Sequence, residues 1–447
     1  MAKDMTKGSI AQALITFSIP LILSGLLQQL YSWADAFIVG NIEGESALAA
    51  IGATTVIVNL FTMAINGFTS GVSILAGQRF GAGEREIQKK ILFSFVLILG
   101  VVSLVLCGTG ITFMDHFLVL LKTPEDIYEL SKGYIQIIML GVPFMAVYNV
   151  YSAVLRGIGD SKAPFYSVMV SSAANVVLDI LFVGSFGWHV EGAAAATILS
   201  QIMMTVFIVV YSMKKYEIMR FRPDKSMFDK NVVKDGTALA LPITIQWVIS
   251  SLGSLALQNF MNSFGTVTVA AISTAYRVDS VIMLPVINLG TGIATVTSQN
   301  VGAGDEKRAK RCLYVGTGIM AVTSIVLTLF VTTFGGSLIG LFGVTEECKA
   351  IGAEFFRCIA MFYIVFGTSV AVRGYLQGNG EVLLTGIIGI LCMVVRIALS
   401  YLLRPIFRNM VIAYAEAFAW CFQLIMYLGQ LAFFVRSRKK EGRKHGI

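Results

Sequence analysis

The chain contains little charge. Only 13% of its 447 residues are Asp, Glu, Lys or Arg, whereas a soluble domain usually carries about 25%. Hydrophobic residues make up 56% of the chain. This composition excludes an ordinary soluble protein. Apolar stretches of about 20 residues recur along the sequence, which predicts an integral membrane protein built from helices.

Residues that perform metal, redox or phosphate chemistry are also scarce. The three histidines, His116, His189 and His445, fall in expected loops or in the tail and lack His-x-x-x-His spacing. The six cysteines form no Cys-x-x-Cys pair, which disfavours a zinc or disulfide framework. No Gly-Lys dipeptide completes a phosphate-binding loop, so ATP hydrolysis at such a loop is excluded. We therefore expect a protein that is not an enzyme and has no organic cofactor.

One unit of the sequence occurs twice. Segment 77–84 returns as 298–305, and segment 155–160 returns as 376–381, both at an offset of 221 residues. Two shorter matches share the offset, namely 49–51 with 270–272 and 125–126 with 346–347. A constant offset over four separated segments predicts two copies of a unit of roughly 220 residues. In a membrane protein such a duplication is typical of transporters, whose substrate path lies between the repeats.

The hydropathy pattern predicts twelve transmembrane helices, six in each copy. The expected spans are 14–39, 50–76, 91–112, 133–155, 163–183, 191–213, 236–262, 269–298, 311–333, 350–372, 383–403 and 410–435. An even number of crossings gives both copies the same orientation, so the repeat is parallel. We predict an all-α fold with two pseudo-symmetric six-helix lobes, 1–213 and 236–435. A basic linker, 214–235, joins them, and a basic tail, 436–447, follows.

The basic residues predict the orientation of these helices. Of the 34 Lys and Arg residues, 26 fall on the side that holds both termini, the linker 214–235 and the loops 77–90 and 300–311. Short cytoplasmic loops carry such an excess, so both termini are expected in the cytoplasm of a multi-pass protein. The net charge of +8 reflects this topology and does not imply nucleic acid. The basic segments serve as topological anchors, or alternatively contact anionic membrane lipid.

Four polar residues are expected at one depth inside the membrane. Asp35, Asp179 and Thr197 each lie a few residues inside the outer end of a predicted helix, and Asn175 lies one turn deeper than Asp179 on the same face. Buried acids are costly and usually functional. Their oxygens suit Na⁺, or a proton shared between close carboxylates. The alternative is that each Asp simply caps a helix end near water.

The second copy does not repeat these acids. The offset places Ala256 opposite Asp35 and Ser400 opposite Asp179. A polar site in this copy would have to use residues such as Gln246 and Asp279. The remaining charged residues of its predicted helices are expected mainly to pair structurally: Arg277, Glu354, Arg357, Arg396 and Glu416. Glu354 and Arg357 have i,i+3 spacing, whereas Arg396 and Glu416 would pair across helices.

Two further features concern motion and substrate. Pro20 and Pro242 interrupt the first helix of each copy and make bending of these helices available. Tyr31, Tyr148 and Met145 are candidates for an adaptable aromatic cavity, although each is more often a packing residue.

Together these motifs resemble the multidrug and toxic compound extrusion (MATE) transporters. The resemblance rests on Gln-x-x-Gly-Ala-Gly at 78–83 and 299–304, on Leu-Arg-Gly-Ile-Gly-Asp at 155–160, and on Asp-Ala-Phe-Ile-Val-Gly at 35–40. It covers the whole chain. It implies secondary active export of drugs or metabolites, often organic cations, by antiport with H⁺ or Na⁺.

The resemblance also assigns residues and a location. Asp35, Asn175, Asp179 and Thr197 match the amino-lobe cation site of the family's DinF-like branch in type and order. An acidic residue that other branches use in the seventh helix has no counterpart here. The resemblance further implies a monomer in the bacterial cytoplasmic membrane, with a small organic substrate as its partner.

Two competing functions remain. A lipid-linked oligosaccharide flippase of related fold would need a more cationic cavity, whereas the amino lobe contributes acids and no buried base to the predicted spans. A channel is disfavoured because the sequence contains no repeated filter ring.

Overall fold

The computed structural model describes residues 4–120, 123–220 and 224–444, and these ranges fold into helices without a strand. The expected linker includes 221–223 and the expected tail includes 445–447, which lie outside the described residues.

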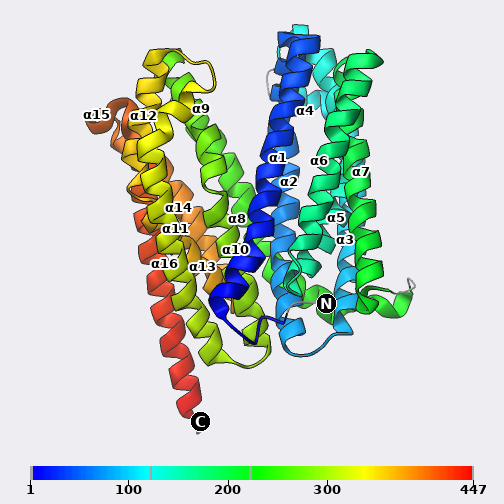
Figure 1. Ribbon diagram of the computed structural model, residues 1–447, viewed down its shortest axis with the longest axis vertical. Helices are drawn as coiled ribbons and strands as arrows, with labels where there is room; N and C mark the ends of the chain where they lie inside the picture. Colours follow the sequence, from blue (N-terminus) through cyan, green and yellow to red (C-terminus); the bar gives the residue numbers. More distant parts are fainter. Residues whose placement is uncertain (1–3, 121–122, 221–223, 445–447) are drawn as a thin grey trace. The chain divides into compact units, whose positions relative to one another are not determined.

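The helices are shown in Figure 1. The first half contains α1 (Ile10–Glu43), α2 (Glu45–Gly81), α3 (Ile87–Thr112), α4 (Met114–Leu120), α5 (Glu125–Gly157), α6 (Lys162–Asp179), the π-helical η1 (Ile180–Ser185), α7 (His189–Lys215) and the short η2 (Glu217–Met219) and η3 (Lys225–Met227). The second half contains α8 (Lys230–Asn262), α9 (Thr266–Ile282), α10 (Leu284–Gly302), α11 (Glu306–Gly340), α12 (Glu346–Ala360), α13 (Tyr363–Gly378), α14 (Val382–Leu402), α15 (Arg404–Phe407), η4 (Arg408–Met410) and α16 (Val411–Lys444).

The described helices reproduce the predicted spans. Ten of them are long and apolar enough to cross a membrane. Two further spans are bent pairs: α9 with α10, at 41°, and α12 with α13, at 51°. Pro285 stands in the first turn of α10, where its missing N–H and fixed φ favour the start of a new helix. Counting each bent pair as one span gives twelve, which confirms the predicted fold.

The compact units differ from the predicted lobes at the first helix of each copy. Unit 1 contains Ile19–Thr244, whereas unit 2 contains Met5–Ser18 together with the chain from Ile245 onward. Helix α1 therefore begins in unit 2 and ends in unit 1, and α8 begins in unit 1 and ends in unit 2. The boundaries expected at 213 and 236 follow the repeat in the sequence, but the packing exchanges one helix end from each copy.

Two repeat-related glycines make this exchange possible. A Cβ on Gly71 of α2 would lie 2.3 Å from the Cα of Ala240 in α8, within unit 1. A Cβ on Gly292 of α10, 221 residues later, would lie 2.7 Å from Ser18 Oγ in α1, within unit 2. Small residues allow helix backbones to approach this closely in membranes. Each copy thus provides the same contact surface for the first helix of the other copy.

The start of the chain is fastened in unit 2. Met5 is fully buried, and its backbone N–H donates to Gln299 Oε1 at 2.9 Å. The guanidinium of Arg308 donates to the backbone carbonyls of Met5, Lys7 and Gly8 at 2.9–3.2 Å. These contacts fix the segment that leads into α1.

The repeated glycine motifs form tight turns after helices. Gly83 and Gly304 have φ of 79° and 73°, a region that favours glycine. The next residue in each copy donates its N–H five residues back, from Glu84 to Arg79 and from Asp305 to Asn300, both at 3.0 Å. This bond closes a Schellman motif and ends the helix.

Asp160 organises the corresponding turn between α5 and α6. Its Oδ1 accepts the backbone N–H groups of Lys162 and Ala163 at 3.0 and 3.1 Å. Its Oδ2 accepts from Tyr216 and, at 2.9 Å, from the ammonium of Lys215 at the end of α7. Burial opposes ionisation of this carboxyl group, but the hydrogen bonds from Tyr216 and Lys215 outweigh it and lower the pKa of Asp160.

We predict that Gly71→Ala destabilises the protein. The added methyl group would overlap the backbone of Ala240, and overpacking of this kind costs about 1–3 kcal/mol. Thermal unfolding in detergent measures the effect. Gly52→Ala in the same helix is the control, because a Cβ there has nothing within 4 Å and alanine favours a helix. Equal melting temperatures for the two variants would contradict the predicted crossing.

We predict that Asp160→Asn lowers stability at neutral pH but has little effect in acid. Because the folded-state pKa of Asp160 lies below its unfolded value of about 3.9, its ionised form stabilises the protein above that pH. The stabilisation is lost as the pH falls through the folded-state pKa. We expect a deficit of about 1–3 kcal/mol at pH 7 that shrinks below about pH 4.

Thermal unfolding between pH 7 and pH 3 measures this dependence. Glu381→Gln, at the repeat-equivalent position, is the matched control because its side chain makes no cap bond. A deficit for Asp160→Asn that is the same at every pH would contradict the prediction.

Candidate functional site

The structure brings Asp35 and Asp179 together within unit 1. Asp35 lies on α1, eight residues before its end, and Asp179 is the last residue of α6. Asp179 is fully buried, and the two carboxyl groups are within hydrogen-bonding reach of each other. Neither group can donate while both are ionised. Accordingly, both oxygens of Asp179 and Oδ1 of Asp35 are buried without a donor among the described residues.

Asn175 adds two further unsatisfied atoms. Its residue is 1% exposed, and both its amide oxygen and its amide nitrogen lack a hydrogen-bond partner in the described chain. It lies one helical turn before Asp179 on α6, as the i,i+4 spacing predicts. Buried polar atoms are almost always hydrogen-bonded, so five orphaned atoms on these residues require an explanation.

Two further residues of unit 1 bear on this region: Thr197, which the sequence predicts at the site, and Tyr134, which no sequence pattern marks. Thr197 is half-buried on α7, a helix that packs against α6. Tyr134 of α5 is 8% exposed and is an electrostatic neighbour of both Asp35 and Asp179. A tyrosine among many in apolar helices carries no sequence signal. Only the approach of α5 to α1 shows that Tyr134 lies beside the acids.

The backbone around Asp179 is irregular. Directly after this residue the chain continues as the π-helix η1, and such segments occur frequently at functional sites. His189, the first residue of α7, has a φ of 51° and its Nδ1 lies 2.6 Å from Glu43 Oε2 at the end of α1. Non-glycine residues in this region are strained and persist where the surroundings fix them.

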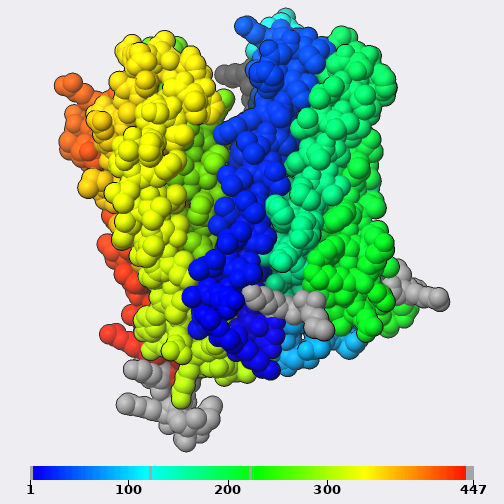
Figure 2. All heavy atoms as spheres, in the orientation of Figure 1, coloured from blue at the N-terminus to red at the C-terminus, as the bar shows by residue number. Residues whose placement is uncertain are grey.

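The C-terminal part of α1 packs in unit 1 near this region. Val39 is fully buried in a cluster that includes Tyr134, Val183 and Val190. The space-filling view shows this part of α1, in blue, beside α6 (Figure 2). Asp35 is therefore one turn from a well-packed anchor of α1, so its position relative to Asp179 is held by apolar contacts.

The three candidate cavity residues do not share one environment. Tyr31, one turn before Asp35, is an electrostatic neighbour of both aspartates. Tyr148 instead interacts with Arg156 near the C-terminal end of α5. Met145 is partly buried, with its sulfur 3.9 Å from Thr62 Oγ1. Arg156 Nε is buried without a partner in the described chain, although Arg156 lies one residue beyond the predicted span 133–155.

The donor set of unit 1 fits a small monovalent cation or a proton. Carboxylate and amide oxygens are hard ligands suited to Na⁺, and a proton between the two carboxyl groups would supply the donor that both lack. Among the described residues no group of three or more His, Cys, Asp or Glu side chains converges. Asp35, Asn175 and Asp179 are the residues that would hold the cation, whereas no described contact joins the side chain of Thr197 to them.

The polar residues expected in the second half separate into different environments. Asp279 is buried and accepts a hydrogen bond from Tyr363 at 2.5 Å. Gln246 packs against Gly389 of α14, and its Oε1 has no partner in the described chain. No described contact joins Gln246 to Asp279. Arg277 is exposed, and Glu354 and Arg357 are exposed without an ion pair between them in the described chain, so that predicted pairing is wrong.

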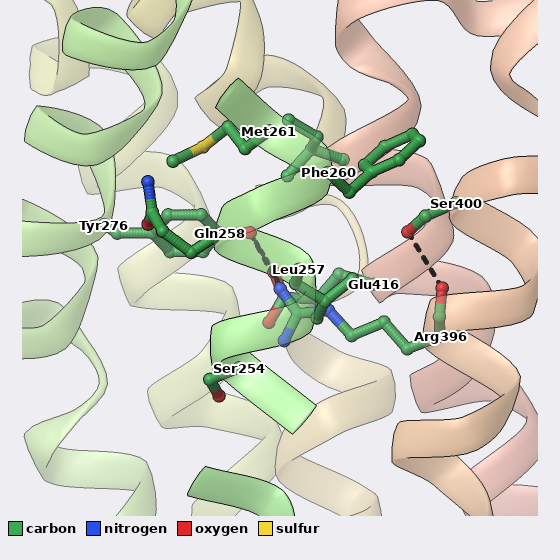
Figure 3. Close-up of a pocket in the computed structure, with 10 residues that line it drawn as sticks. Ser254, Leu257, Gln258, Phe260, Met261, Tyr276, Arg396, Ser400 and Glu416 are labelled. Carbon is green, nitrogen blue, oxygen red and sulfur yellow. Dashed lines mark hydrogen bonds and ion pairs between the residues drawn. The ribbon is translucent and has the colours of Figure 1, made fainter. Parts of the chain in front are cut away.

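Arg396 and Glu416 pair across α14 and α16, as predicted. Arg396 Nη2 donates to Glu416 Oε2 at 2.8 Å, and the hydroxyl of Tyr276 lies 2.8 Å from both groups. The ion pair lines a pocket of about 360 Å³ within unit 2, shown in Figure 3. The other lining residues are Ser254, Leu257, Gln258, Phe260, Met261, Ser400 and Ile412.

Comparison with known proteins gives consistent results. The family model MatE matches residues 20–181 and 242–402, one segment in each copy of the repeat. The chain is 30% identical over 382 residues to the probable multidrug resistance protein YpnP of Bacillus subtilis, covering 86% of this chain and 85% of that protein. It is 29% identical to the probable multidrug resistance protein YoeA of Bacillus subtilis, covering 95% and 94% of the two chains.

Solved structures share the fold. One, described as an outward-facing conformation of a multidrug resistance MATE family transporter, has a TM-score of 0.89 at 20% identity and covers 98% of this chain and 99% of its own. Another, described as MATE in the bent conformation, has a TM-score of 0.86 at 20% identity and covers 98% of both chains. At this identity the likeness establishes the fold only.

Proposed function

Because the chain belongs to the MatE family, we propose that it is a multidrug efflux transporter in which cation entry at Asp35 and Asp179 drives export of small organic compounds. The coupling ion is H⁺ or Na⁺. The protein is a multi-pass membrane transporter and not an enzyme. Its relatives in Bacillus subtilis are named as probable multidrug resistance proteins, which supports drug-like substrates for this chain.

The observation that carries the proposal is the set of five orphaned polar atoms on Asp35, Asn175 and Asp179. Two carboxylates that face each other at low dielectric repel strongly, so the site favours binding of one positive charge. Because a cation is the missing partner, the free energy of its binding is available to bias the conformation of the transporter.

The site can couple to motion because Asp35 is on α1. This helix contains Pro20, and the hydroxyl of Ser24 donates to the Pro20 carbonyl at 3.0 Å. Proline removes a helix hydrogen bond and permits bending in membranes. We infer that neutralising the pair changes the packing of α1 and lowers affinity for an outward-facing cationic substrate. The coupling then follows from differential binding to two states.

The orientation and location are part of the proposal. The excess of basic residues on one side supports cytoplasmic termini, and the bacterial relatives support the cytoplasmic membrane. A monomer suffices, because both copies of the repeat lie in one chain. A lipid-linked oligosaccharide flippase is not favoured, since the relatives reported above are multidrug resistance proteins.

We predict that Asp35→Asn abolishes coupled export while the protein still folds, because Asn keeps the shape of Asp and removes its charge. Asp279→Asn should reduce export less, since Tyr363 already satisfies Asp279 within unit 2. Efflux of a fluorescent organic cation from proteoliposomes, under separately imposed Na⁺ and proton gradients, measures coupling. Equal and complete loss in both variants at matched reconstitution would point to a cation path that uses both units.

We predict that raising the pH strengthens Na⁺ binding until the pair is fully ionised. Protons and Na⁺ neutralise the same oxygens and therefore compete. Calorimetric Na⁺ titration between pH 5 and pH 9 tests the wild type and Asp179→Asn, which should bind at least tenfold more weakly because a charged contact is lost. Undiminished binding by the variant would show that the two aspartates do not form one site.

A further inference from the structure

The pocket in unit 2 is built at the repeat-equivalent position of the cation site. The offset of 221 residues carries Asn175 to Arg396 and Asp179 to Ser400, and both of these line the pocket. Asp35 corresponds to Ala256, next to the lining residue Leu257. Equivalent positions of the repeat therefore carry side chains of different charge in the two units. Two acids without a counter-charge occupy it in unit 1, and an arginine occupies it in unit 2.

The ion pair in this pocket leaves polar atoms without a partner on both side chains, and Arg396 Nε is buried without one in the described chain. The described contacts of the pair use Arg396 Nη2 and Glu416 Oε2. Arg396 Nη1 and Glu416 Oε1 take part in no described hydrogen bond, and neither atom is among the fully buried ones. A guanidinium can donate from both terminal nitrogens and a carboxylate can accept at both oxygens. The pair therefore offers a donor and an acceptor of opposite charge, side by side.

The rest of the lining is mainly apolar and aromatic. Phe260 and Met261 lie at one end of the pocket and Ser254 at the other, with Leu257 beside Glu416 (Figure 3). Phe260 and Met261 are each 3% exposed, so their positions are fixed by packing. The volume of about 360 Å³ lies within the range of small-molecule sites. Such a wall suits one aromatic ring system.

We propose that this pocket binds an aromatic zwitterion, with its carboxylate on Arg396 Nη1 and its ammonium group on Glu416 Oε1. This proposal rests on the proposed function and names a substrate class for it. A buried ion pair is neutral as a whole, so a ligand with one charge would leave an uncompensated charge in a low-dielectric site. A zwitterion keeps the site neutral and adds a charge-assisted hydrogen bond at each end.

Asp279 does not change this preference. Its carboxyl group is an electrostatic neighbour of Arg396 and Glu416, but it does not line the pocket. It accepts the hydroxyl hydrogen bond of Tyr363 instead. The polar groups that a ligand would meet are thus those of Arg396, Glu416 and the neutral residues Gln258, Ser254 and Ser400.

Three ligands that share an indole ring test the proposal. Tryptophan carries both charges, tryptamine carries only the ammonium group, and indole-3-propionate carries only the carboxylate. Binding to the purified full-length protein in nanodiscs is measured by calorimetry without an ion gradient. Failure of cation coupling at Asp35 and Asp179 therefore does not affect the result. We expect tryptophan to bind about tenfold or more tightly than either singly charged ligand.

Variants of the pair assign each contact. Arg396→Gln should abolish the preference for tryptophan over tryptamine, and Glu416→Gln should abolish its preference over indole-3-propionate. Each single variant leaves one buried charge unpaired and is at risk of misfolding. The double variant Arg396→Gln/Glu416→Gln removes both charges together and should bind all three ligands within about threefold of one another. Arg277→Gln, an exposed residue of the same helix as Tyr276, is the matched control and should retain the wild-type order.

Three results would overturn the proposal. Wild-type protein that binds tryptamine or indole-3-propionate as tightly as tryptophan would show a site for a singly charged ligand. A double variant that keeps the tryptophan preference would place recognition elsewhere. Absence of binding by all three ligands would show that Arg396 and Glu416 only fasten α14 to α16.

Discussion

Two carboxyl groups face each other inside a membrane domain, and the described protein around them offers no donor to either oxygen of Asp179. In a low-dielectric interior this arrangement is unstable unless a positive charge joins it. The apolar packing of Val39 on α5 and α7 holds α1 close enough to maintain the pair. Unit 1 thus supplies the geometry of the pair, and the proposed function assigns the balancing positive charge to a bound cation.

In unit 2 the buried charge at the equivalent position is balanced by another side chain of the same unit. At the position equivalent to Asn175 it places Arg396, which pairs with Glu416 and Tyr276. Because that charge is already balanced, no cation is needed to stabilise it. The two copies therefore place different side chains at one repeat position: acids without a described donor in unit 1, and an ion pair that is neutral as a whole in unit 2. This asymmetry gives a duplicated protein two distinguishable sites without a change of fold.

The sequence predicted the parts of the structure that depend on local pattern. Apolar length gave the twelve spans, and the constant offset identified the repeated segments 77–84 and 298–305, in which Gly83 and Gly304 adopt a backbone conformation that favours glycine. The i,i+4 spacing placed Asn175 beside Asp179. Contacts between distant helices were less accessible. Nothing local marks Tyr134 as a neighbour of Asp35, and spacing alone wrongly paired Glu354 with Arg357.

The repeat in the sequence did not predict that the two units exchange helix ends. A repeat boundary suggests that each copy packs on itself, yet Met5–Ser18 pack in unit 2 and the rest of α1 packs in unit 1. The reason lies in Gly71 and Gly292, where the absence of a side chain lets a helix from the other copy approach. Arg308 fastens the start of the chain to unit 2, whereas Asp35 lies on the part of α1 in unit 1. A continuous helix with Pro20 between these points connects the segment that packs in unit 2 with the segment that carries Asp35.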